Sequence, residues 1–177
     1  MVAIIGENLS SWADALSELA FKFTRDFEGQ FGYSPGENSL VRAAPEAGAE
    51  TVEALAAAGV PRALCDFYGQ VERVSLPDLD SGYFVHSAVE VLSGVNGEQP
   101  TKLDGNVSDS ILVFGSDGGG GLFALGGARG SVYRLSGGSV MGDTYQTGRL
   151  GEKVASSDFR GFLEILRGEL VNSIIPR

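Results

Sequence analysis

The chain of 177 residues has the length of one domain, and its 43% hydrophobic and 20% charged residues are typical of a folded globular protein. Its 13 basic and 23 acidic residues leave a net charge of −10, which argues against binding nucleic acid or an anionic membrane through a basic face. One cysteine and one histidine exclude an internal disulfide and the usual kind of zinc site, and the lack of a basic leader or membrane-length apolar run predicts a cytoplasmic protein without membrane contacts.

Charge and glycine are distributed unevenly along the chain. Residues 1–100 contain 15 acidic and five basic residues, which accounts for the whole net charge. In contrast, 13 of the 26 glycines fall between Gly115 and Gly151, among short apolar runs. We therefore expect an acidic, helical first part and a turn-rich second part made of strands.

A first helix is predicted near the N-terminus. Large apolar residues recur in steps of three and four from Leu9 to Phe27, which is the pattern of an amphipathic helix. Ser10 or Ser11 can cap its first turn, and Gly29 can end it. The apolar face of this helix is expected to pack on the core.

A linker and two shorter helices are predicted to follow. Residues 29–48 contain prolines and glycines and few periodic apolar residues, so they predict a linker, with a strand over residues 39–42 left open. A second helix is predicted over residues 51–58 and a third over residues 61–71, where a proline suits the first turn. Cys65 lies among apolar neighbours of the third helix, which indicates a buried, unreactive thiol.

The second part predicts strands and a closing helix. Residues 88–92 fit a strand or a helical turn. At the end of the chain, a helix capped by Ser156 or Ser157 is predicted from Phe159 to Leu170. Short apolar runs separated by spacers too short for a crossover predict antiparallel strands over residues 83–85, 111–114, 122–125 and 131–135. The expected fold is α+β, a mainly antiparallel sheet flanked by helices, with a helical extension over residues 1–45 and the main unit over residues 46–177.

No motif in the chain predicts catalysis, a metal or a cofactor. The glycine run over residues 115–121 is followed by Leu122 and Phe123 where a phosphate loop has Lys and Ser or Thr, and Asp117 would repel an anion. The run therefore predicts a turn that needs positive φ angles. His86 is not accompanied by a nucleophile motif, so we expect a half-buried structural histidine and a protein that is not an enzyme.

Three stretches of sequence stand out by their order along the chain. They form a helix pair broken before a proline, two strands joined by the glycine run, and a final helix of the FxxFLxxL kind. Their sequences are ETVEALAAAGVPRALCDFYGQV, SILVFGSDGGGGLFALGGARGSVYRL and VASSDFRGFLEIL. In this combination, over about residues 50 to 170, the chain resembles the SUKH superfamily, the Smi/Knr-type family of fungal cell-wall regulators and bacterial immunity proteins.

The resemblance implies a non-enzymatic binding protein with the α+β scaffold of that family. Bacterial members are encoded beside secreted toxins, many of them nucleases, and neutralise the cognate toxin by binding it. The expected partner is thus a protein, a toxin domain with a basic surface, to which an acidic protein is steered. The alternative is an intracellular regulatory scaffold without a toxin partner, as in the fungal relatives. No cofactor is implied, and the toxin and the oligomeric state stay open.

Four acidic residues are the predicted contacts to the partner: Asp66, Glu72, Asp78 and Asp80. They connect the helix pair to the first strands, where we expect an exposed junction loop, and binding residues are often found on such loops. The alternative is that these carboxylates only keep the protein soluble.

Overall fold

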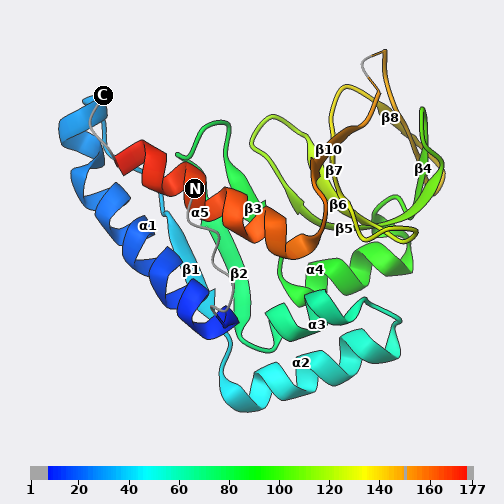
Figure 1. The fold of residues 1–177 in the computed structure, drawn as a ribbon, viewed down its shortest axis with the longest axis horizontal. Helices are drawn as coiled ribbons and strands as arrows, with labels where there is room; N and C mark the ends of the chain where they lie inside the picture. The colour runs from blue at the N-terminus through cyan, green and yellow to red at the C-terminus, as the bar shows by residue number, and fades with distance from the viewer. Residues whose placement is uncertain (1–7, 150, 175–177) are drawn as a thin grey trace.

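The computed structural model describes residues 8–149 and 151–174 and has an α+β fold (Figure 1). Its helices are α1 (Leu9–Phe31), α2 (Pro45–Ala57), α3 (Arg62–Tyr68), α4 (Ala88–Ser93), which continues into the turn η1 (Gly94–Glu98), and α5 (Phe159–Ile174). Its strands are β1 (Ser39–Arg42), β2 (Val71–Leu76), β3 (Tyr83–Val85), β4 (Lys102–Asp104), β5 (Asp109–Ser116), β6 (Leu122–Gly126), β7 (Val132–Leu135), β8 (Ser139–Met141), β9 (Thr144–Gln146) and β10 (Lys153–Ser156).

One mostly antiparallel sheet runs through the molecule. Its strands follow the order β1-β2-β3-β5-β4-β9-β8, and β6 and β7 extend from β5 toward β10. The pair of β4 and β9 is parallel, and the other pairs between described strands are antiparallel. In Figure 1 the strands from β4 to β10 curl away from α1 into a partial barrel with a small core of its own.

The first helix is longer than predicted at its C-terminal end. Asn8, and not Ser10 or Ser11, caps it, because the Asn8 Oδ1 accepts the Ser11 N–H at 2.8 Å. The helix passes through Gly29 and ends at Gly32, whose φ of 80° is the left-handed conformation of a helix C-cap. Within the described residues, no helix is both long and apolar enough to cross a membrane.

The linker predicted over residues 29–48 contains two regular elements. The strand left open over residues 39–42 forms as β1 and pairs antiparallel with β2. The second helix begins at Pro45, earlier than residue 51, because a proline at the first helical position has a favourable φ and no N–H to leave unpaired.

The segment predicted as an exposed junction loop contains β2, so this part of the prediction was wrong. The third helix ends at Tyr68, and Val71, Val74 and Leu76 of β2 are buried in the core. Val74 and Leu76 alternate with the less buried Ser75, as in a half-buried strand, whereas two exposed residues separate Val71 from Val74 where the pairing with β1 shifts register.

The strands predicted in the second part are confirmed as β3, β5, β6 and β7, and the antiparallel pairs of β5 with β6 and of β6 with β7 form as expected. Residues 88–92 belong to helix α4. A capping box, in which Ser87 and Glu90 each bond the other's backbone N–H, starts that helix.

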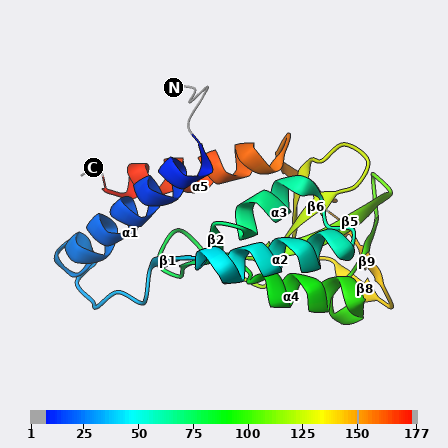
Figure 2. The ribbon, with the colours of Figure 1, turned by 90° about the horizontal axis from the view of Figure 1, so that it is seen from below.

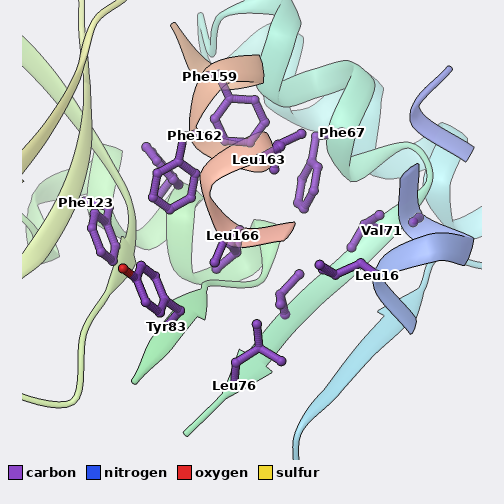
Figure 3. Packing of buried hydrophobic residues seen from close by; sticks show 14 of the residues in the cluster. Leu16, Phe67, Val71, Leu76, Tyr83, Phe123, Phe159, Phe162, Leu163 and Leu166 are labelled. Carbon is purple, nitrogen blue, oxygen red and sulfur yellow. The ribbon is translucent and has the colours of Figure 1, made fainter. Parts of the chain in front are cut away.

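Phenylalanines from α5 and the sheet form the centre of the core (Figure 3). The Phe162 ring lies 5.1 Å from the Phe114 ring and 4.9 Å from the Phe123 ring, measured between centroids. Trp12 and Leu16 of α1 are buried in the same core, and the Trp12 Nε1 donates to the Leu163 carbonyl at 3.2 Å. Helix α1 therefore packs on the same core as α5.

The start of the final helix differs from the prediction in its cap. The Asp158 carboxylate accepts the Gly161 N–H at 2.7 Å, which is the bond of an N-cap residue. Ser156 lies in β10 and donates its hydroxyl to the Asp158 carbonyl. The predicted apolar face of the helix is confirmed, because its five periodic residues are buried: Phe159, Phe162, Leu163, Leu166 and Leu170.

Candidate binding surface

The four predicted contact residues do not form one patch. Asp66 lies on α3, exposed, and its carboxylate is 3.6 Å from Arg62 one turn earlier. Glu72 is exposed at the start of β2, whereas Asp78 and Asp80 follow the other end of that strand. A strand of six residues spans about 20 Å, so the two ends face different parts of a partner.

Asp78 stabilises the protein's own fold. Its Oδ2 accepts the Gly36 N–H and the Asn38 side-chain N–H, both at 2.7 Å, and the Asp78 N–H donates to the Asn38 Oδ1 at 3.3 Å. These bonds tie the segment before β1 to the turn after β2. Asp80, in the same turn, is exposed and has a φ of 52°, a left-handed conformation that Asp tolerates better than most residues.

Residues 117–121 of the glycine run form the turn between β5 and β6, which confirms the predicted turn, although residues 115 and 116 belong to β5 and Gly120 alone in the run has a positive φ, of 84°. Its organising group is Asp117, whose Oδ1 accepts the N–H groups of Gly119 and Gly121 at 2.9 and 2.7 Å. Arg134 pairs with the other carboxylate oxygen at 2.8 Å. A Cβ on Gly121 would lie 2.5 Å from that oxygen, so only glycine fits there. The N–H groups of Gly119 and Gly121 therefore bind the Asp117 carboxylate of the same turn.

Two opposed effects act on the pKa of Asp117. Burial raises it, but the hydrogen bonds from Arg134, Gly121 and Gly119, together with the Arg134 charge, outweigh burial and hold the pKa below its ordinary value. The carboxylate is therefore charged in the folded protein at neutral pH.

His86 is half-buried directly after the end of β3, beside a cleft of about 230 Å³ that Arg73 and Glu90 also line. Its Nε2 lies 2.9 Å from the Ser116 Oγ, and its carbonyl accepts the Tyr68 hydroxyl at 2.7 Å. Burial lowers the pKa of His86, against the smaller opposing effect of the Glu90 charge. A neutral imidazole bonded to Ser116 fits the half-buried position predicted from the sequence.

We expect an NMR titration of the only histidine to give a pKa below about 6.5, the value for an unfolded chain. Because the folded-state pKa is the lower one, the contribution of His86 to stability is present above pH 6.5 or so and is lost as the pH falls through the folded-state value. A histidine pKa at or above 6.5 would contradict this.

Cys65 is confirmed as a buried thiol. Its side chain is 5% exposed and its Sγ contacts the Val60 carbonyl at 3.4 Å. Burial is the main cause that raises its pKa, with a smaller contribution from the Asp66 charge.

Within residues 8–149 and 151–174, no three His, Cys, Asp or Glu side chains gather in a way that could hold a metal ion.

A groove of about 360 Å³ lies between α2, β2 and α4. Figure 2 shows α4 running beside α2 on the underside of the molecule. Small side chains make up much of the lining, and Glu72 is the predicted contact residue that borders it. The full lining is Ala43, Ala44, Ala47, Thr51, Tyr68, Glu72, Arg73, Ser87, Ala88 and Val89.

An exposed row of carboxylates lies along α2, next to this groove. Glu46, Glu50 and Glu53 are separated by steps of four and three, which places them on one side of the helix. In the described part of the chain, no cation forms an ion pair with any of the three. We call Glu46, Glu50 and Glu53 the α2 acidic row. These three residues are not among the predicted contacts, although their spacing without intervening bases is visible in the sequence.

Comparison with family models, with curated proteins and with solved structures found no match for this chain.

Proposed function

We propose that this protein is a non-enzymatic, immunity-type binding protein of the SUKH kind, which neutralises a toxin domain with a basic surface by binding it. The order of sequence stretches that resembles the SUKH superfamily supports the family, and the α+β fold agrees with it. The observation that carries the binding role is the α2 acidic row beside the groove, where charges are exposed and unpaired.

The charge of this surface favours a basic protein partner for a physical reason. Carboxylates already paired within the protein gain little from a partner's cation, whereas unpaired ones attract it at long range and raise the association rate. The Asp66 carboxylate is close to Arg62, and the Asp78 carboxylate accepts hydrogen bonds from the protein's own Gly36 and Asn38. The α2 acidic row and Glu72 are therefore the carboxylates beside the groove that a partner's cations can pair with.

The test is to co-express the protein with toxin domains encoded by neighbouring genes, where the genome contains them, and to measure growth and association kinetics. We expect the parent protein to restore growth. The variant Glu46→Lys/Glu50→Lys/Glu53→Lys should associate about tenfold more slowly, or slower still, at low salt, and the difference should shrink at high salt.

A matched control separates this surface from net charge alone. Glu28→Lys/Glu98→Lys/Asp104→Lys changes three exposed acidic residues elsewhere and has the same net charge as the α2 variant. We expect it to associate at nearly the parent rate. Equal slowing in both variants would mean that the α2 acidic row has no special role, and the parent's failure to protect cells would refute the proposed function.

A further inference from the structure

The two helices that border the groove beside the α2 acidic row line it with small side chains, which leave room for a segment of a partner. Ala47 and Thr51 line it from α2, and Ala88 and Val89 line it from α4. Val89 is 72% exposed, an apolar side chain at the groove that the protein itself leaves uncovered. Because the side chains that α2 and α4 contribute to the lining are small, a ridge of larger side chains from a partner fits between the two helices.

Negative charge flanks this groove. On a helical projection the three carboxylates of the α2 acidic row span about 60°, and Ala47 and Thr51 lie on the adjoining flank. Glu72 borders the groove from β2. Arg73 is the cation among the lining residues, and it lies near Glu90. Burial raises the pKa of Glu90, but the hydrogen bonds from Ser87 and the charges of His86 and Arg73 outweigh burial, so the net effect is a pKa below the ordinary value.

We propose that this groove binds an amphipathic basic helix of the partner. Apolar side chains along one stripe of that helix enter the groove, and lysines or arginines along the neighbouring stripe pair with the α2 acidic row. This inference rests on the proposed function, because the helix belongs to the toxin domain.

The spacing of the carboxylates favours a helix over an extended peptide. With a rise of 1.5 Å per residue, Glu46 and Glu50 are about 6 Å apart along the axis of α2, and Glu50 and Glu53 about 4.5 Å. Basic residues at positions i, i+4 and i+7 of a helix lying along α2 repeat these distances. In an extended peptide, side chains on one face recur evenly at about 6.7 Å, which does not match.

The first experiment uses a synthetic 18-residue helical peptide with lysines at i, i+4 and i+7 spacing and leucines on the adjoining stripe. Its control has the same composition in an order that spreads lysines and leucines around the helix. Because the charge is equal, we expect the ordered peptide to bind the full-length protein about tenfold or more tightly by calorimetry, through its apolar stripe. Equal affinities would show that only net charge is sensed and would overturn the inference.

The second experiment blocks the groove. Ala47→Trp fills it from α2, and Val89→Lys places a cation at its exposed wall; both should weaken binding of the ordered peptide about tenfold or more. Ala56→Trp, on the opposite, exposed side of α2, is the matched control and should bind as the parent does. Thermal melts check that each variant is folded. If Ala47→Trp is unfolded, the binding measurement with Val89→Lys alone tests the groove.

The toxin assay separates this inference from the proposed function. If the parent protects cells and the folded Val89→Lys and Ala47→Trp variants protect equally well with unchanged toxin affinity, the groove does not receive the toxin and the inference fails alone. If the parent gives no protection, the proposed function itself fails. A parent dimer that Val89→Lys dissociates, seen by sedimentation, would assign the groove to a second copy of the chain and also overturn the inference.

Discussion

Phe162→Ala is expected to lower the free energy of unfolding by about 3–5 kcal/mol, a large part of the roughly 5–15 kcal/mol that stabilises a domain. The Phe162 side chain is 1% exposed and contacts the rings of Phe114 and Phe123, so its removal leaves a cavity between α5 and the sheet. In a thermal melt, this loss should lower the Tm by roughly 6–20 °C.

The control for this substitution lies on the same helix. Val171 is 38% exposed, and Val171→Ala should change the free energy of unfolding by less than about 1 kcal/mol. A Phe162→Ala melt that coincides with the melt of Val171→Ala would show that α5 does not bury this face.

Asp117→Asn is expected to have the second largest effect, a loss of about 2–3 kcal/mol at pH 7 in urea melts. The Asp117 side chain is 6% exposed, so the substitution leaves Arg134 facing an amide in a site built for a carboxylate. The control is Asp143→Asn, which breaks an exposed pair with Lys102 at the same 2.8 Å distance. Because both side chains of that pair are more than half exposed, water screens it, and its loss should leave the urea melt close to that of the parent.

The effect of Asp117→Asn should depend on pH. Burial raises the pKa of Asp117, but its hydrogen bonds outweigh burial, so the folded-state pKa lies below the unfolded value of about 3.9. The carboxylate therefore stabilises the fold above about pH 4, and this contribution disappears as the pH falls through the folded-state pKa. The stability difference between parent and Asp117→Asn should shrink in melts at pH 3. An equal difference at pH 7 and pH 3 would show that the carboxylate's charge is not what stabilises the turn.

Elements with a strong local pattern were predictable from the sequence. The spacing of apolar residues in α1 and α5, and the short apolar runs of β5, β6 and β7, show which side of each element is buried because the period belongs to the element itself. The turns between those strands are too short for any but antiparallel pairing, so their order followed as well. Burial of Cys65 and the turn at the glycine run followed from near neighbours in the same way.

The short strands were decided by tertiary pairing. β4, β8, β9 and β10 have three or four residues each, too few for a clear period. β4 and β9 pair with each other across a long stretch of sequence and β10 pairs with β7, whereas β8 forms a hairpin with β9 that the parallel pair of β4 and β9 joins to the sheet. β2 was hidden for a related reason. Two consecutive exposed residues, Glu72 and Arg73, interrupt its alternation, and pairing with β1 and β3 stabilises it as a strand.

At the candidate binding surface, too, some features follow from the sequence and others only from the tertiary structure. The sequence by itself determined that the excess acid lies in residues 1–100, because charge is a property of composition. Only the tertiary structure decided which carboxylates are free: Asp78 meets Asn38, 40 positions away, and Asp117 meets Arg134, 17 positions away. Glu46, Glu50 and Glu53 face solvent because Leu55 and Gly48 turn the other side of α2 inward. Such partners depend on the path of the whole chain, and a local pattern carries no information about that path.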